Sequence, residues 1–316
     1  MENVITLEKE LKNYFNYNWE RVRFLSQFTL ALIDSKSVNL SLVADNFTTG
    51  AKTKSTYRRI QKFFKDFDVD YKQTAEFLSN FIEDDKWTLA IDRTCWVIGS
   101  QEVNILMLAV SYKGMAIPLI WELLTEEDEK SGKKGNSHTK DRKNIIDKFI
   151  SIFGKDKIKA ITADREFIGE DWFKYLVSSD LPFVIRIKKN FIIEHNQETK
   201  EAWKFLNKEG SVKLTDSKVL GQKLDIVGKE LEDDYLILAT NIDIKENNIF
   251  NIYSKRWGIE TMFGAFKSKG FNLEDTKLKD LKKIKKLLAL LSIAFVWIFK
   301  IGEFMDTQEP IPFKKN

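Results

Sequence analysis

The chain has very little of two residue types that build metal centres and catalytic triads. Its 316 residues include one cysteine, Cys95, and two histidines, His138 and His195. One cysteine excludes an intramolecular disulfide and a thiolate metal cluster. Two histidines disfavour a histidine-rich zinc site and a catalytic triad built on histidine. Carboxylates are the remaining ligands, and they suit a hard cation such as Mg²⁺.

Long apolar runs are also missing. Charged residues interrupt residues 1–15 every few positions, so the apolar core of a signal peptide is absent there. The longest apolar run extends from Leu287 to Phe299 with Ser292 inside it, which is too short to span a bilayer. We therefore expect a soluble, cytoplasmic protein that does not contact a membrane.

The charge balance identifies no partner by itself. Lys and Arg number 51 against 47 Asp and Glu, a net charge of +4, so the distribution of charge along the chain is more informative than its sum. Hydrophobic residues at 43% and aromatic residues at 13% exclude a disordered chain. The length predicts two or three structural units.

Residues 1–84 are expected to form a helical, DNA-binding N-terminal domain. Their apolar residues recur at steps of three and four, which is typical of helices. Residues 40–47 and the stretch from Thr53 resemble a helix-turn-helix with a basic second helix, whose natural partner is DNA. A solvated basic face without a partner is the alternative. The basic residues of the second helix include Arg58, Arg59 and Lys62.

From Trp87 the pattern changes to strands. Three apolar segments joined by short links predict an antiparallel meander. A helix, a strand and a second helix follow, which is the order of a ribonuclease-H-like domain with acids at its strand ends. We therefore expect an α/β fold, with residues 85–180 as the first part of the catalytic domain. The segments are 87–92, 103–112, 115–124, 139–153, 158–164 and 169–178.

Short strand-like segments fill residues 181–245, and residues 246–316 should hold a catalytic helix and a C-terminal helical segment. The apolar run near the C-terminus should be buried because it is hydrophobic nearly all round. A basic run precedes it and forms either a DNA contact or a solvated helix face. Its lysines are Lys279, Lys282, Lys283, Lys285 and Lys286.

Three carboxylates could converge at one edge of this sheet. Asp92 and Asp164 each close an apolar strand, and Glu260 lies on a helix. Carboxylates bind Mg²⁺, and two ions about 4 Å apart can activate the attacking oxygen and stabilise the leaving oxygen in phosphoryl transfer. Each Asp is followed by an arginine, Arg93 or Arg165, which favours a phosphate site. The alternative for an acid at a strand end is a turn or helix-cap residue.

The stretch from Tyr253 to Lys267 has polar residues at helical spacing. Tyr253, Arg256, Glu260 and Lys267 would share one face of a single helix, since each offset is close to a whole number of turns. An arginine can fork two phosphate oxygens, a lysine supplies a point charge and a tyrosine supplies a hydroxyl donor. The alternative is a solvated face with an ordinary Arg256–Glu260 ion pair.

These residues resemble a known family. The four residues from Tyr253 to Lys267 match every defined position of the YREK signature of the insertion-sequence 4 family of DDE transposases. Residues 91–96 and 163–167 are similar to the blocks around the first and second aspartates of that family. The resemblance covers about residues 86–300. It departs at Phe167 and Ile168, the last two positions of the second block.

The resemblance implies a role for each matching residue. Asp92, Asp164 and Glu260 would be the metal-binding triad, with two Mg²⁺ ions in each site and Mn²⁺ as the alternative ion. The tyrosine, arginine and lysine of the signature would hold the phosphates of the transposon end, and one residue from each aspartate block would support them. Those DNA contacts would be Tyr253, Arg256, Lys267, Arg165 and Thr94.

The implied activity is that of a DNA transposase. Such a protein binds the terminal inverted repeats of its element, cleaves by metal-dependent hydrolysis and joins the 3′-hydroxyl ends to target DNA, and copies associate on DNA to pair two ends. Residues 181–245 look like the β-rich insertion that the family places inside its catalytic domain. One alternative is a ribonuclease-H-like nuclease or resolvase that cuts without joining. Another is a catalytically silent DNA-binding descendant.

Trp203 is a candidate for base stacking. The resemblance implies a hairpin at each element end, and a strand bends back more easily when a base is extruded and stacked on an aromatic ring. Trp203 lies in a polar segment of the insertion where a core position is not required. The alternative is that it packs a short helix on the sheet of the insertion.

Overall fold

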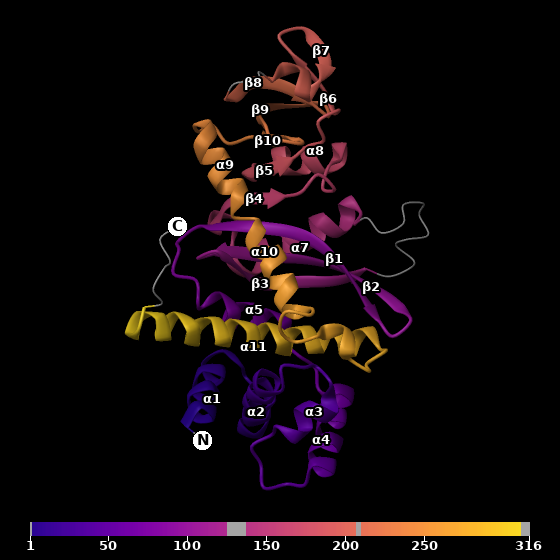
Figure 1. Cartoon of the computed structure of the whole chain (residues 1–316), viewed down its shortest axis with the longest axis vertical. Helices are drawn as coiled ribbons and strands as arrows, with labels where there is room; N and C mark the ends of the chain where they lie inside the picture. The colour runs from indigo at the N-terminus through magenta and orange to yellow at the C-terminus, as the bar shows by residue number, and fades with distance from the viewer. Residues whose placement is uncertain (1, 125–136, 207–209, 311–316) are drawn as a thin grey trace.

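The computed structural model describes residues 2–124, 137–206 and 210–310 (Figure 1). The described chain begins with a group of helices, continues into one mixed sheet and ends in a long helix that lies between the two. This architecture confirms the predicted α/β, ribonuclease-H-like fold with helices at the N-terminus. The exact limits of the four predicted segments stay a prediction.

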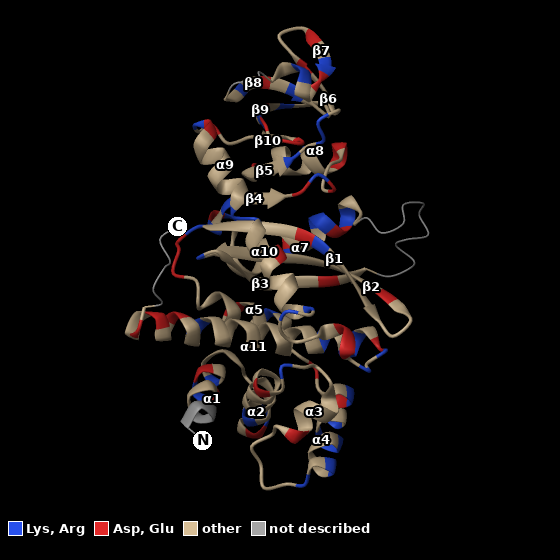
Figure 2. Cartoon of the chain, viewed as in Figure 1, with Lys and Arg blue, Asp and Glu red and all other residues tan. Residues whose placement is uncertain are grey.

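The N-terminal helices begin at polar caps and pack through apolar faces. The side chain of Asn18 accepts a hydrogen bond from the backbone of Arg21, and Asn39 caps the next helix in the same way through Ser41. Helix α4 buries Ile60 and leaves its basic side chains exposed along the outer side (Figure 2). The helices are α1 (Glu2–Tyr14), α2 (Trp19–Ser35), α3 (Leu40–Asp45), α4 (Thr53–Asp66) and α5 (Tyr71–Ser79).

Ten strands of the described chain form one sheet in the order β3-β2-β1-β4-β5-β10-β9-β8-β6-β7. Strand β4 is parallel to β1 and to β5, and the other neighbours are antiparallel. The strands are β1 (Trp87–Ile98), β2 (Gln101–Tyr112), β3 (Met115–Leu124), β4 (Ile158–Ala163), β5 (Phe183–Arg186), β6 (Ile192–His195), β7 (Glu198–Glu201), β8 (Ser211–Val219), β9 (Gln222–Glu230) and β10 (Tyr235–Thr240).

The helices of the catalytic part connect or cover these strands. Helix α7 links β3 to β4. Helix α8 links β4 to its parallel neighbour β5, because parallel neighbours require a crossover. Helix α10 crosses β1, β2 and β3. The helical elements are α7 (Thr139–Phe153), η1 (Lys155–Lys157), α8 (Glu170–Ser178), η2 (Ala202–Phe205), α9 (Glu246–Ser254), α10 (Trp257–Phe266), η3 (Leu273–Asp275) and α11 (Leu281–Gln308).

The first strand of residues 181–245 differs from its expected place. We expected residues 181–187 among the strands of the insertion, but β5 pairs in parallel with β4 and completes the five-stranded order of the core. The strands from β6 to β10 then extend the same sheet instead of forming a separate one, because β10 pairs with β5. The buried run Phe183–Ile185 is apolar on both faces, which suits a strand in the middle of a sheet.

Strand β1 is longer than expected. The sequence suggested a strand that ends at Asp92, but β1 continues to Ile98 and pairs with β2 over its length. Gly99 has φ of +66°, which makes the tight turn between these two strands. The parallel ladder with β4 does end beside Asp92, since its last pair is Ile91 with Ala163.

The predicted single helix from Tyr253 to Lys267 is wrong. Tyr253 lies in α9, Glu260 lies in α10, and the backbone between them makes tighter contacts such as the bond from Arg256 N to Tyr253 O at 3.0 Å. The close packing of α10 on β3 accompanies this break. A Cβ at Gly258 would lie 2.6 Å from the backbone carbonyl of Met115, so only glycine allows this approach.

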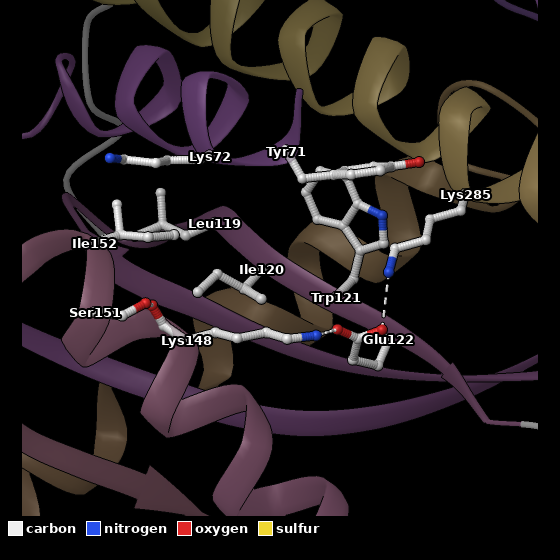
Figure 3. A pocket seen from close by; sticks show the side chains of 10 residues that line it. All are labelled: Tyr71, Lys72, Leu119, Ile120, Trp121, Glu122, Lys148, Ser151, Ile152 and Lys285. Atoms are coloured by element: carbon white, nitrogen blue, oxygen red, sulfur yellow. Dashed lines mark hydrogen bonds and ion pairs between the residues drawn. The ribbon is translucent and has the colours of Figure 1, made fainter. Parts of the chain in front are cut away.

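Helix α11 is the layer between the N-terminal helices and the sheet. It contacts α2 on one side, and α5 and β3 on the other. By length and composition alone it could cross a membrane, but most of its apolar stretch is buried inside the protein. Lys285 donates to Glu122 of β3 at 2.8 Å, and Lys148 of α7 contacts the same carboxylate. These contacts border a cavity of about 300 Å³ at the outer edge of β3 (Figure 3).

Candidate active site at the end of the β1–β4 ladder

The first two acids are neighbours. Asp92 directly follows the last residue of β1 that pairs with β4, and Asp164 directly follows the last residue of β4. Parallel strands present residues at equivalent positions side by side, so the fold brings together two carboxylates that are far apart in sequence. The Oδ1 atom of Asp164 is buried and has no hydrogen-bond partner among the described residues.

The pKa of Asp92 is raised to about 6, chiefly by burial; Arg256 and the Arg93 N–H oppose this rise, and the nearby carboxylates of Glu166 and Asp164 add to it. The Asp92 side chain is 15% exposed. Two partly buried carboxylates on neighbouring strands repel each other when both are ionised. A cation bound between them would relieve that repulsion.

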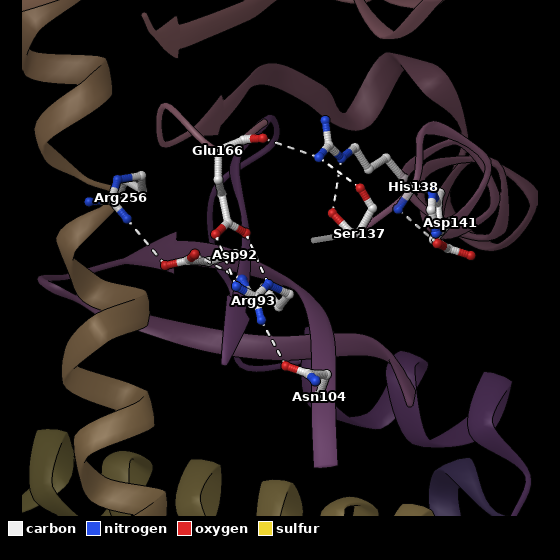
Figure 4. A network of polar contacts seen from close by, with 9 residues as sticks. Asp92, Arg93, Asn104, Ser137, His138, Asp141, Glu166 and Arg256 are labelled. Atoms are coloured by element: carbon white, nitrogen blue, oxygen red, sulfur yellow. Dashed lines mark hydrogen bonds and ion pairs between the residues drawn. The ribbon is translucent and has the colours of Figure 1, made fainter. Parts of the chain in front are cut away.

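Arg256 connects the first acid to the third. Its guanidinium lies 3.2 Å from Asp92 Oδ2 through Nη1 (Figure 4). Through Nη2 it lies 2.7 Å from Glu260 Oε1. The i, i+4 pair with Glu260 that the sequence allowed is therefore present, and the same guanidinium also reaches across to β1. Arg256 is buried, whereas the Glu260 side chain is 55% exposed. The structure thus groups Asp92, Asp164, Glu260 and Arg256 at one edge of the sheet.

The other two residues of the signature lie on either side of this group. Tyr253 is buried against the sheet, its hydroxyl has no hydrogen-bond partner in the described ranges, and burial raises its pKa. The guanidinium carbon of Arg256 is 5.7 Å from its ring. Lys267 ends α10 and donates from Nζ to the Cys95 carbonyl of β1 at 3.1 Å. Arg256 and Lys267 thus contact β1, whereas Tyr253 packs with residues of β4 and β5, so the four residues do not share one exposed helix face.

The two arginines that follow the aspartates have different surroundings. Arg93 lies beside Glu166, with Nε 3.5 Å from Oε1, and donates from Nη1 to Asn104 Oδ1 at 2.7 Å. Arg165 is half exposed and lies 3.6 Å from Asp234. Thr94 is buried on β1, two residues beyond Asp92. The repeated Asp-Arg pattern therefore does not give two equivalent phosphate contacts.

Sequence reasoning missed a network that supports the turn after Asp164 (Figure 4). Buried Arg142 of α7 donates from Nη2 to the Glu166 carbonyl at 3.1 Å and to the Ser137 carbonyl at 2.8 Å. Burial lowers the pKa of Arg142 to about 10. Arg93 holds the Glu166 side chain while Arg142 holds its backbone, so the turn is held from two sides. Only the tertiary structure could reveal this pairing, because the contributing segments are distant in sequence.

Trp257, beside the site, and Trp203 of the insertion differ in exposure. Trp257, which the sequence analysis did not consider, directly follows Arg256 and is 67% exposed. It borders a cavity of about 280 Å³ together with Arg186, Lys229 and Tyr253. Trp203 is 37% exposed, donates from Nε1 to Glu201 at 3.1 Å and lies 6.0 Å from the Tyr235 ring.

A protein-family model described as "Transposase DDE domain" matches residues 83–297, the region that contains the central sheet and the acids. The chain belongs to the DDE transposases. The comparison with curated proteins gives no match. As a DDE transposase, the chain has DNA as its substrate, and members of this family generally work with divalent metal ions.

The residues of this DDE transposase fit such an ion in part. Within residues 2–124, 137–206 and 210–310, no three His, Cys, Asp or Glu side chains lie close enough together to hold a metal. Asp92 and Asp164 nevertheless offer adjacent oxygen ligands, one of them unpaired, and carboxylate oxygens suit a hard cation. Glu260 is held by Arg256 and is exposed enough to change its rotamer.

Proposed function

We propose that this transposase moves its own insertion sequence by cut-and-paste transposition. It would bind the terminal inverted repeats, cleave them by metal-dependent hydrolysis and join the freed 3′-hydroxyl ends to target DNA. The observation that carries the proposal is the adjacency of Asp92 and Asp164 at the end of the β1–β4 ladder, with Arg256 and Glu260 beside them. The spacing of the YREK residues supports membership of the insertion-sequence 4 family.

Asp92, Asp164 and Glu260 would hold two Mg²⁺ ions, or Mn²⁺, which would supply Lewis acidity at the scissile phosphate. The turn after Asp164 is held in place by Arg93 and Arg142, so this carboxylate is kept beside Asp92. Arg256 reaches both Asp92 and Glu260 and can transfer its donors to phosphate oxygens without leaving the site. Water and a 3′-hydroxyl are interchangeable as nucleophiles here, so one site would serve cleavage and joining.

DNA would contact the protein beyond the acids. The side chains of Arg58, Arg59 and Lys62 are exposed on α4, the second helix of the predicted helix-turn-helix. Tyr253, Lys267, Arg165 and Thr94 are the contacts that the family signature suggests near the cleavage site. Two copies would associate on DNA to pair two ends in the cytoplasm.

The deciding experiment supplies purified protein with Mg²⁺, duplexes that end in the element's inverted repeats and a target plasmid. Transposition predicts cleaved ends that become joined to the plasmid. Cleavage without joined products would favour a ribonuclease-H-like nuclease or resolvase. Specific end binding with neither product would favour a silent DNA-binding descendant.

Arg256 and Lys267 should contribute to DNA affinity through phosphate contacts. Replacing either with Ala is expected to weaken end binding and to reduce the slope of log K against log salt by about one unit for each lost contact. Binding titrations over a range of salt concentrations measure this slope. Arg256→Lys is the matched control because lysine keeps the positive charge but cannot donate two parallel hydrogen bonds to a phosphate group. Unchanged slopes in both Ala variants would show that these two side chains make no phosphate contacts.

Trp257 should assist hairpin formation if a base is extruded at the cleavage site. Stacking on an aromatic ring contributes about 1–3 kcal/mol per base, so Trp257→Ala is expected to slow hairpin formation about ten- to a hundredfold with nicking unchanged. Trp203→Ala should have a smaller effect, because its ring already contacts Tyr235 and Glu201. Gel assays that separate nicked strands from hairpins measure both steps. Equal slowing of both steps by Trp257→Ala would exclude the stacking role.

A further inference from the structure

Two basic segments that are far apart in sequence line one groove. Helix α4 contributes Tyr57, Gln61 and Lys65, the segment that leads into α11 contributes Lys277, and the first turn of α11 contributes Lys283. The groove has a volume of about 320 Å³. Figure 2 shows that Lys and Arg positions follow one another along the outer side of the α4 ribbon and also occur at the start of α11. The basic run before α11, which the sequence left as either a DNA contact or a solvated face, therefore lies next to the basic helix of the N-terminal domain.

The lysines of the groove are not neutralised by the protein. Lys65, Lys277 and Lys283 have no ion pair within 4 Å in the part of the chain that the structure describes, and no acid is among the described residues that line the groove. Lys65 and Lys277 are exposed, and Lys283 is half-buried. Three positive charges on a concave surface attract an anion and repel one another when no anion is bound.

Two other lysines of the same run have structural roles. Lys285 pairs with Glu122 of β3 at 2.8 Å, and buried Lys286 donates to the Phe64 carbonyl of α4 at 3.2 Å. Of the lysines of this run, Lys285 and Lys286 thus hold α11 in place, and Lys283 faces the groove. A merely solvated helix face would not show this division.

The walls of the groove are fixed relative to each other. Phe64 lines the groove, and its carbonyl accepts the bond from Lys286. The backbone N–H of Val38, just before α3, donates to the Phe271 carbonyl at 3.0 Å. These bonds join the N-terminal helices to the chain on either side of the groove, so its cations keep their spacing before any ligand binds. Such preorganisation lowers the entropy lost on binding.

We propose that this groove binds the sugar–phosphate backbone of the transposon-end duplex and continues the basic face of α4 onto the catalytic part of the chain. Lys65, Lys277 and Lys283 supply point charges, while Tyr57 and Gln61 supply hydroxyl and amide donors for phosphate oxygens. The contact reads no bases, so it adds affinity without sequence preference. This inference rests on the proposed function, because it takes the element's end as the ligand.

The test compares Lys277→Ala, Lys283→Ala and the double variant with the wild-type chain. Each single change is expected to lower the salt slope of end binding by about 0.9, and the double change by about twice that. The affinity ratio between an inverted-repeat duplex and a random duplex should stay constant, since only phosphate contacts are lost. Thermal melting should be unchanged because neither lysine side chain has a described structural partner, and the backbone bond from Lys283 to Asp280 is kept in the Ala variant.

Lys218→Ala is the matched control. Lys218 lies on β8, pairs with Glu194 at 3.4 Å and is at the opposite end of the molecule from α4 (Figure 1). The salt slope of end binding by Lys218→Ala should equal that of the wild type. If both single variants and the double variant bind the inverted-repeat duplex with the salt slope of the wild type, the groove does not bind DNA. The proposed function would not be affected by that result. A wild-type chain that binds no inverted-repeat duplex would overturn both.

Discussion

Changing Asp92, Asp164 or Glu260 to the matching amide should abolish strand cleavage while end binding remains nearly intact. The amide keeps the shape of the side chain but removes the negative charge that a hard cation needs. The expected loss is at least about three orders of magnitude in cleavage rate, the scale on which removing one member of a catalytic set usually acts. Binding persists because the phosphate contacts come from other residues. Parallel cleavage and gel-shift assays measure the two effects.

The pH dependence of stability shows whether the Asp92→Asn substitution has damaged the fold. The pKa of Asp92 is raised from 3.8 to about 6, so the folded protein holds the proton more tightly than the unfolded chain does. The wild type should therefore lose stability relative to Asp92→Asn as pH rises from about 4 to about 6, and the difference should stay constant above that range. Thermal melting at several pH values measures it.

Two outcomes would contradict this assignment of the acids. Cleavage at a near wild-type rate in one variant would remove that residue from the triad. Loss of end binding together with cleavage would indicate that the acid supports the structure. A matched control is Glu274→Gln, which removes a carboxylate that accepts a bond from the Val97 backbone and should leave cleavage unchanged.

Gly258→Ala should destabilise the protein and reduce cleavage together. The added Cβ would lie 2.6 Å from the Met115 carbonyl carbon and oxygen and 3.1 Å from Ala116 N, all of them backbone atoms that no rotamer change can move. Overpacking of this kind typically costs about 1–3 kcal/mol. Helix α10 would have to move away from β3, and Glu260 would move with it. Chemical denaturation measures the free energy of unfolding, and the cleavage assay measures the displacement of the acid.

Gly264→Ala is the matched control on the same helix. A Cβ at Gly264 would meet only the flexible Lys269 side chain, at 3.4 Å. This change should leave stability unchanged or raise it by up to about 1 kcal/mol, because alanine favours a helix more than glycine does. If Gly258→Ala were as stable and active as Gly264→Ala, close packing of α10 on β3 would not be required.

The sequence alone determined the order of elements and the positions of the acids. The predicted helix 139–153 coincides with α7, and the predicted strand 158–164 coincides with β4 except for its last residue, because apolar periodicity reflects which face of each element is buried. The ribonuclease-H-like order follows from those elements. The spacing from Tyr253 to Lys267, with the two aspartate blocks, predicted a DDE transposase without any knowledge of the contacts, and the family match supports that prediction.

Other features depended on contacts between distant segments, which local patterns do not contain. The break between α9 and α10 accompanies the close approach of Gly258 to Met115, and Glu166 meets Arg93 and Arg142 only after β1, β4 and α7 have packed. The extension of β1 beyond Asp92 depends on its long pairing with β2. The groove between α4 and α11 exists only because the two ends of the chain pack together. Periodicity specifies which face of an element is buried, and only packing specifies against which partner.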